Sequence, residues 1–263
     1  MSSVFEERFV IFIDILGFAD MISEAKRSPA GEMAERVDKA LTRIENMGLH
    51  GPDRVCPEPS IDGYHSHIFS DCIVISVSPE PSAVSKLTIE LAKLTLSLME
   101  IGVWIRGGMS HGQISRKKTA PWGPAIVEAY EVESKLAVFP RIALSESAVQ
   151  FFDQSAESSK EDRFLIRDSD GVWSLAPFIW AAHDSKTERP FLTEVRAKNI
   201  KEKLEEAHRR IVDKPAVFRK IDWLIEKWDW HLKPEGGVPA FDCRTEIGKK
   251  HDLVRIFNEA LDD

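Results

Sequence analysis

Hydrophobic and polar positions in the first part of the chain follow two different periods. Residues 9–18, FVIFIDILGF, are apolar or glycine except at Asp14, which predicts a strand buried on both faces. Residues 19–47 carry apolar side chains among charges, a pattern typical of one or two helices. Residues 64–77, YHSHIFSDCIVISV, form two short β-branched and aromatic runs that meet at Ser70-Asp71. This last pattern predicts a hairpin with a polar tip.

A helix and a further strand follow. Residues 82–101 place leucines and one isoleucine at helical spacing, which predicts a helix facing the core. Residues 103–114, VWIRGGMSHGQI, predict a strand that tolerates a close backbone approach at Gly107 and Gly108. Strand, helix, hairpin, helix, strand is the order of a ferredoxin-like α+β core with an antiparallel-rich sheet and flanking helices.

The second half of the chain adds elements to this core. A helix near residues 125–138 and a strand at 141–144 extend it, and VWSLAPFIW at 172–180 predicts a late strand that leaves the core. From about residue 185 the pattern is strongly helical, with a last helix at 245–263. We therefore expect a catalytic domain at 1–185 and a C-terminal helical extension at 186–263.

Composition narrows the class of protein. The chain has 263 residues, enough for one large domain or for one domain with an appendage, and a net charge of −8. That charge argues against a dedicated nucleic-acid binder, although it does not exclude a nucleotide substrate. Three scattered cysteines imply no disulfide framework, no apolar run is long enough for a membrane helix, and no signal-peptide pattern is evident. We expect a cytoplasmic protein that binds neither nucleic acid nor membrane.

Two acidic residues stand where a strand meets a turn. Asp14 ends the first strand, and Asp71 lies at the tip of the hairpin. A strand-end aspartate is by itself more often a helix cap or a turn residue. In a ferredoxin-like sheet, however, the first strand lies beside the hairpin, so the two carboxylates can face each other. Close carboxylates repel unless a cation lies between them, which favours a divalent metal site.

Four stretches in chain order resemble motifs of class III nucleotidyl cyclases. IDILGF at 13–18 resembles the first-strand metal motif, and FSDCIVIS at 69–76 resembles the metal-binding hairpin, with Ser70 in place of a glycine. WIRGGMSHGQI at 104–114 and WGPAIVEAYEVESKLAVFPRIALSESAV at 122–149 resemble the strand and the helix–strand unit that follow. The resemblance implies the class III cyclase fold over roughly residues 9–150.

The resemblance also implies a metal site. Asp14, Asp71 and the carbonyl of Ile15 would bind two divalent ions, Mg²⁺ or Mn²⁺, which hold the triphosphate and lower the pKa of the ribose 3′-hydroxyl. The backbone N–H groups of Leu16, Gly17 and Phe18 at the start of a helix are suited to bind phosphates, and Gly17 permits a close approach.

Several positions depart from the purine cyclase pattern. The asparagine and arginine of the motif helix are replaced by Val127 and Glu131, and the base-reading positions fall on Ala120 and His67. This combination is similar to the pyrimidine cyclases of bacterial Pycsar anti-phage systems. The resemblance implies a homodimer with active sites at the subunit interface that makes cyclic UMP or cyclic CMP from UTP or CTP, sensed by a separate effector.

The sequence identifies candidate residues for binding the base and the phosphates less specifically than it identifies the two metal-binding aspartates. Tyr64 and His67 lie on the hairpin strand leading to Asp71, and as neutral donors they favour UTP over CTP, although odd–even spacing places them on opposite faces of a regular strand. Arg106 is the candidate for a phosphate or base contact, with pairing to a surface acid as the alternative. Two rival functions stay open: a degenerate cyclase-homology module for dimerisation or nucleotide sensing, and a purine cyclase with a rearranged pocket.

Overall fold

The computed structural model describes residues 4–47, 49–50, 58–59, 61–116, 121–154, 165–176, 178, 192–210 and 214–231. The elements of the first half follow the expected order. They are β1 (Glu6–Ile15), α1 (Phe18–Arg27), α2 (Glu32–Glu45), β2 (Leu49–His50), β3 (Glu58–Pro59), β4 (His65–Phe69), β5 (Cys72–Val77), α3 (Pro81–Met99) and β6 (Ile105–Arg116). Two helices rather than one therefore follow the first strand.

Strand order confirms the ferredoxin-like core. The strands lie in the order β4-β5-β1-β6, and each neighbouring pair is antiparallel. The sheet continues past β6 through β8 (Ile142–Leu144), β10 (Trp173–Leu175) and β9 (Leu165–Arg167), while β7 (Pro121–Trp122) pairs with β6 alone. The eight strands form one mixed sheet because β8 joins β6 in parallel. The α+β fold class is thus confirmed.

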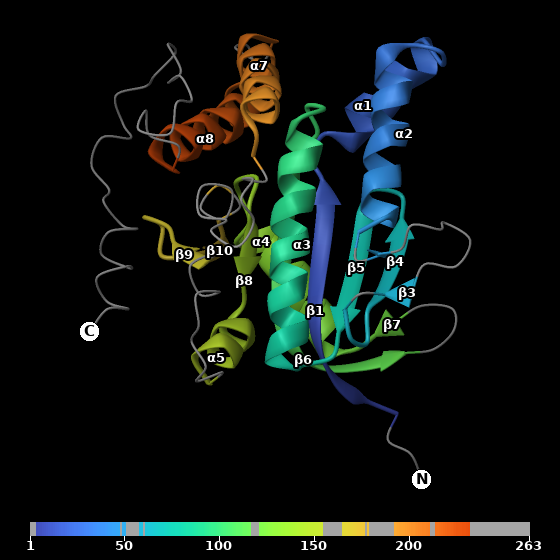
Figure 1. Cartoon of the computed structure of the whole chain (residues 1–263), viewed down its shortest axis with the longest axis vertical. Coiled ribbons are helices and arrows are strands. Elements are labelled where there is room, and N and C mark those ends of the chain that lie inside the picture. Colours follow the sequence, from blue (N-terminus) through green and yellow to red (C-terminus); the bar gives the residue numbers. More distant parts are fainter. Residues whose placement is uncertain are drawn as a thin grey trace.

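The two faces of the sheet carry different layers (Figure 1). Odd-numbered residues of β1, such as Phe9 and Ile13, lie in the main core with α2 and α3, whose stripe of leucines is buried as expected. Even-numbered residues, such as Val10 and Asp14, face the opposite side, where α4 (Pro124–Lys135) covers part of the sheet. The pleat of β1 therefore directs its one acidic side chain away from the main core.

Close backbone approach at the paired glycines of β6 is also confirmed. A Cβ atom at Gly108 would lie 2.7 Å from the backbone nitrogen of Glu133 in α4. A Cβ atom at Gly107 would lie 2.6 Å from the carbonyl oxygen of Phe12 in β1. Glycine at both positions lets β6 contact a helix on one face and a strand backbone on the other.

The late strand does not leave the core, contrary to the sequence expectation. Residues 173–175 form β10, which pairs with β8 at Ser174 and so extends the main sheet. The alternation of Trp173, Ser174 and Leu175 was too short to predict a pairing partner. The expected domain boundary near residue 185 and the expected helix at 245–263 both lie outside the described residues.

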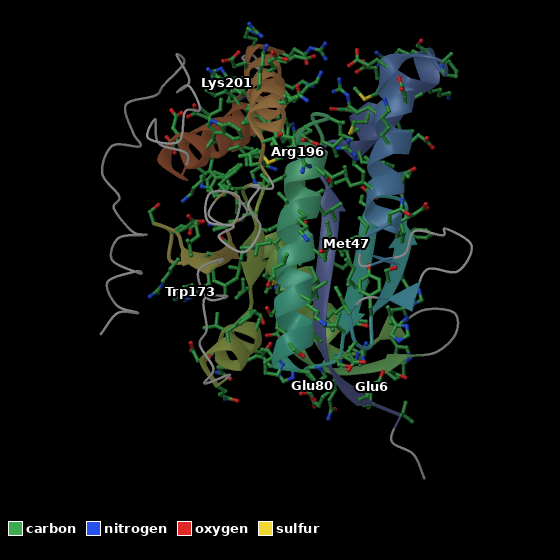
Figure 2. The ribbon with its side chains drawn as sticks, viewed as in Figure 1. Glu6, Met47, Glu80, Trp173, Arg196 and Lys201 are labelled. Carbon is green, nitrogen blue, oxygen red and sulfur yellow. The ribbon has the colours of Figure 1, made fainter. Side chains whose placement is uncertain are left out.

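Two C-terminal helices pack on the end of α3. They are α7 (Glu194–Arg210) and α8 (Pro215–His231), and their buried apolar residues form a second cluster with Leu96 and Met99 of α3. Arg196 of α7 pairs with Glu100 just beyond α3 (Figure 2). Among the described residues, no helix is both long and apolar enough to cross a membrane.

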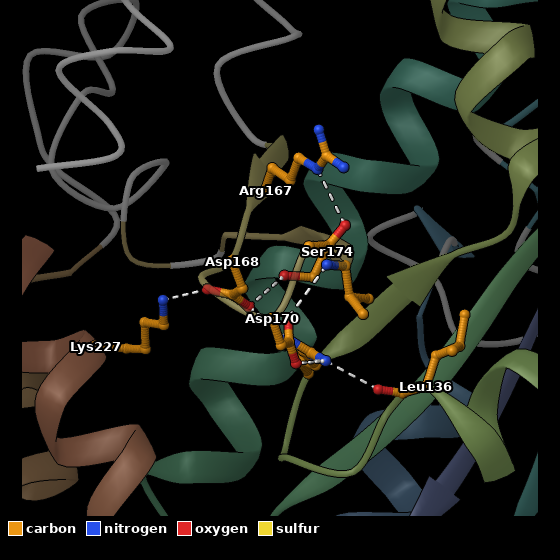
Figure 3. A network of polar contacts seen from close by, with 9 residues as sticks. Leu136, Arg167, Asp168, Asp170, Ser174 and Lys227 are labelled. Carbon is orange, nitrogen blue, oxygen red and sulfur yellow. Dashed lines mark hydrogen bonds and ion pairs between the residues drawn. The ribbon is translucent and has the colours of Figure 1, made fainter. Parts of the chain in front are cut away.

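A buried polar network joins α8 to the edge of the sheet (Figure 3). The guanidinium of Arg141, whose side chain is 1% exposed, donates to Asp168 at 2.7 Å and to the carbonyl oxygen of Leu136 at 2.9 Å. Arg141 also pairs with Asp170 at 2.5 Å, and Lys227 of α8 pairs with Asp168. These contacts connect the end of α4, the start of β8, the β9–β10 turn and α8.

Replacing Lys227 with methionine is expected to loosen α8 from this network. Asp168 keeps Arg141 as a partner, and the lysine side chain is 20% exposed, so we expect a loss of about 1 kcal/mol in the free energy of unfolding. Urea denaturation followed by tryptophan fluorescence measures this loss. Lys198→Met on α7, where the side chain is 76% exposed, is the matched control and should change nothing measurable. Equal stabilities of the two variants would contradict the anchoring role of Lys227.

Candidate active site

Three strands and one helix bring the candidate residues together. Asp14 of β1 lies directly opposite Arg106 of β6 and Cys72 of β5. Residues directly opposite in antiparallel strands share a face, so these three side chains point to the side of the sheet that α4 covers. From that helix Glu133 reaches the same place. The register of the sheet and the packing of α4 therefore build this cluster from residues that are far apart in the chain.

Arg106 lies between two carboxylates. Its Nε atom is 3.0 Å from Oδ2 of Asp14 and 2.7 Å from Oε1 of Glu133. Because Nε carries a single hydrogen, it donates a hydrogen bond to Asp14, and Oε1 of Glu133 is left without a hydrogen bond from the described residues. The side chain of Glu133 is 3% exposed, whereas that of Asp14 is 19% exposed. A buried acceptor with no donor thus lies beside an accessible carboxylate.

Charges of both signs act on the buried groups of this cluster. Burial raises the pKa of Glu133, and the nearby charge of Asp14 raises it further, whereas Arg106 and Lys220 oppose the shift. Burial also raises the pKa of the Cys72 thiol, and the carboxylates of Asp71, Asp14 and Glu133 add to that effect. Three carboxylates therefore act on one thiol, so a cation bound at this place would be favoured by the local field.

Asp71 lies at the tip of the hairpin, as the sequence predicts. Ser70 and Asp71 form the two-residue turn between β4 and β5, and the carbonyl oxygen of Asp71 accepts a hydrogen bond of 3.3 Å from the N–H of Ile15. This bond fixes the turn beside the carboxyl end of β1. The two aspartates, Asp14 and Asp71, are thereby brought to the same end of neighbouring strands.

Ser70 has a φ of 58°, the one positive value at a non-glycine residue in the described part of the chain. Side chains rarely adopt this left-handed conformation, which costs about 1–2 kcal/mol outside glycine. We expect Ser70→Gly to raise the free energy of unfolding by about 0.5–1 kcal/mol in thermal or urea denaturation, after the entropic cost of glycine. Ser66→Gly in the adjacent strand is the control and should have the opposite sign. A destabilised Ser70→Gly variant would contradict the assigned turn geometry.

The donor set fits a hard divalent cation. Asp14 and Asp71 offer carboxylate oxygens, the ligands that Mg²⁺ and Mn²⁺ prefer. No group of three or more His, Cys, Asp or Glu side chains arranged to hold a metal occurs among the described residues. A cation at this place would therefore use two carboxylates and complete its shell with backbone carbonyls, water or substrate oxygens. The role of the Ile15 carbonyl stays a prediction.

The turn after β1 supports only part of the predicted phosphate site. Gly17 has a φ of 75° and precedes the first turn of α1, with open space where a Cβ atom would lie. The N–H of Leu16, however, donates to the carbonyl oxygen of Trp104 at 2.9 Å. This amide continues the pairing of β1 with the segment before β6, which argues against Leu16 as a phosphate contact. Gly17 and Phe18 stay candidates.

The pleat of the hairpin strand separates the two predicted base contacts. His67 lies opposite Val74, on the face of Asp14, and is exposed. Tyr64 is 8% exposed and lies in the main core on the other face, where burial raises the pKa of its hydroxyl. Burial in the main core argues against Tyr64 as a substrate contact. His67 remains a candidate.

The two positions of α4 at which this sequence departs from the purine cyclase motif are exposed to solvent. Val127 is 57% exposed, and Glu131 is exposed and pairs with Lys135 at 3.3 Å. Neither side chain contacts the Asp14 cluster in the contacts described. Ala120 lies outside the described residues.

One residue of the cluster, and a second residue whose charge acts on it, were missed from the sequence. Glu133 belongs to the motif helix that carries the family resemblance, and its position one turn after Ala129, which packs on β6, could have placed it on the covered face. Lys220 belongs to α8, and its charge acts on Glu133. Nothing in the local sequence of α8 relates it to a strand end more than 100 residues earlier.

Comparisons with known proteins return structures only. No protein-family model matches the chain, and no curated protein matches it. The catalytic core of a rhodopsin-guanylyl cyclase with converted specificity, in complex with ATPαS, is similar over 65% of this chain and 96% of its own, with 14% identity and a TM-score of 0.40. A class III adenylyl cyclase-like ATP-binding protein from Pseudomonas aeruginosa is similar over 65% of this chain and 38% of its own, with 13% identity and a TM-score of 0.44.

A bacterial light-regulated adenylyl cyclase is similar over 76% of this chain and 57% of its own, with 12% identity and a TM-score of 0.44. At these identities and scores the likeness alone does not establish a shared activity. The function of this chain must therefore be argued from its own residues.

Proposed function

We propose that this protein is a class III nucleotidyl cyclase that converts a pyrimidine nucleoside triphosphate, UTP in preference to CTP, to the 3′,5′-cyclic nucleotide and pyrophosphate. One observation carries the proposal: the hairpin turn holds Asp71 beside the carboxyl end of β1, so that two aspartates lie next to a glycine turn that opens a helix. Carboxylates for a metal and a helix start for phosphates are the two parts that such a reaction requires.

In the reaction, the ribose 3′-oxygen bonds to the α-phosphorus, the bond from that phosphorus to the β-phosphate bridging oxygen breaks, and the hydroxyl proton leaves to solvent. Asp14 and Asp71 would hold the divalent ions. Bound Mg²⁺ or Mn²⁺ would supply charge neutralisation and a lower pKa for the attacking hydroxyl. The amides of Gly17 and Phe18 would bind the outer phosphates, and the Arg106 guanidinium, held by Asp14 and Glu133, would stabilise charge at the α-phosphate.

Two further parts of the proposal come from the family resemblance. Val127 and Glu131 replace the groups that serve purine cyclases, which supports a pyrimidine substrate. A homodimer is supported by exposed apolar side chains at the hairpin tip and on α4, where Phe69 is 83% and Tyr130 52% exposed. In that setting the product would act as a signal in anti-phage defence, sensed by a separate effector.

The direct test is incubation of purified protein with each of the four NTPs and Mn²⁺ or Mg²⁺, with chromatography of the products. We expect cyclic UMP as the main product, together with one pyrophosphate for each turnover. Cyclic AMP or cyclic GMP as the main product would replace the pyrimidine assignment by the purine one. No cyclic product from any NTP would refute the cyclase.

The second candidate is a cyclase-homology module that binds a nucleotide without turning it over. The ion pair between Arg106 and Asp14 favours it, because the arginine occupies an oxygen that a metal would use. Nucleotide binding by calorimetry without product formation would support this module.

A further inference from the structure

The C-terminal helix α8 and the residue before it contact the rest of the chain at three points. The Trp223 ring stacks on Phe139, in the loop after α4, with centroids 5.3 Å apart and planes 8° apart. Lys227 pairs with Asp168, and Nζ of Lys214 lies 3.8 Å from Asp20 in the first turn of α1. The N-terminal half of α8 therefore lies between α1 and the loop that follows α4.

Helical spacing places Lys220 on the inner side of α8. Lys220, Trp223 and Lys227 are separated by three and four residues, so they form one stripe along the helix. Two members of this stripe contact the core, at Phe139 and Asp168. Lys220 lies one turn nearer to α1 than Trp223, and its side chain is part-buried. In Figure 1, α8 lies at the same end of the molecule as the carboxyl end of β1.

Charges of the candidate site act on this lysine. Burial lowers the pKa of Lys220 and the Arg106 charge lowers it further, whereas Asp14 and Glu133 raise it. No hydrogen bond or ion pair of its ammonium group is found within the described part of the chain. A partly desolvated cation without a close anion is costly, and a bound anion would offset that cost.

We propose that Lys220 binds the triphosphate of the substrate, so that the C-terminal helices complete the active site rather than only supporting the fold. The inference deepens the proposed function and rests on it for the identity of the substrate. A lysine ammonium is a compact point charge suited to phosphate oxygens. It would act together with the amides of Gly17 and Phe18 at the start of α1.

Inorganic triphosphate with Mg²⁺ is the probe that isolates this contact. Calorimetry on the full chain should show binding to the wild type that Lys220→Met weakens at least about tenfold, the effect of losing one charge-assisted contact. Lys220→Arg keeps the charge and should bind within about threefold of the wild type, which a purely structural role would not require. Lys198→Met, an exposed lysine on α7, is the control and should bind like the wild type.

The same variants are assayed for cyclic product, and their unfolding is compared by urea denaturation. Lys220→Met should lower kcat/KM at least about tenfold without any loss of stability. Triphosphate binding that depends on Lys220 without turnover of any NTP would refute the cyclase but keep the anion site. Turnover by the wild type with no effect of Lys220→Met on binding or kcat/KM would overturn the anion site and keep the cyclase. A wild type that binds no triphosphate would also overturn it.

Discussion

Replacing Asp71 with asparagine is expected to lower the rate of cyclic nucleotide formation on the order of 1,000-fold and to leave the fold intact. Asparagine keeps the size of the side chain but removes the charge that a divalent cation requires. The structural contact of Asp71 is made by its backbone carbonyl, which accepts from the N–H of Ile15 and is unchanged by the substitution. Product formation with Mn²⁺ is measured at saturating substrate, beside urea denaturation of the same preparation.

Asp62→Asn is the matched control for this experiment. Asp62 is exposed, whereas Asp71 is half-buried, but Asp62 also belongs to the β4–β5 region and also accepts through its carbonyl, from the N–H of Ser78 at 3.1 Å. It lies before β4, at the other end of the hairpin from Asp71. The control should retain wild-type turnover. Wild-type turnover of the Asp71→Asn enzyme would refute the metal site.

Sequence periodicity was sufficient for most of the fold. The strand with a single acid, the hairpin and the stripe of leucines each show the period of one kind of element, and their order is that of the ferredoxin-like core that the strand order confirms. The β10 strand was misplaced because three residues carry too little pattern to show which strand they join. The position of α8 on the core was also beyond the sequence, since it depends on contacts such as Trp223 on Phe139.

The sequence predicts a residue of the candidate site only where the position of that residue follows from its own local segment. Asp14 and Asp71 could be placed because each lies at the end of a strand. Tyr64 and His67 point to opposite faces of the hairpin strand, and the sequence does not show which face carries the site. Leu16 was assigned to phosphate because its amide was assumed to be free, and only the pairing with Trp104 shows that it is used. Glu133 reaches the site because α4 packs on β6, and the charge of Lys220 acts on Glu133 from α8.

The packing of α4 on β6 leads to the second large effect. A Cβ atom at Gly108 would lie 2.9 Å from the Cβ atom of Val132 and 2.7 Å from the backbone nitrogen of Glu133. A helix backbone cannot yield as the end of a flexible side chain can, so Gly108→Ala must move α4 away from the sheet. We expect a loss of about 3 kcal/mol in the free energy of unfolding, as for overpacked cores.

The same displacement withdraws Glu133 from Arg106, which then loses one of its two carboxylate partners. Because a misplacement of about 1 Å can cost on the order of 100-fold in rate, the folded Gly108→Ala enzyme should lose turnover to that extent. Gly107→Ala is the informative comparison, since its Cβ atom meets the Phe12 carbonyl on the opposite face and leaves α4 in place. Both variants should lose stability in urea denaturation, and Gly108→Ala should lose more turnover per folded molecule than Gly107→Ala. Equal turnover in the two variants would show that the position of Glu133 does not matter, and that Arg106 is oriented by Asp14 alone.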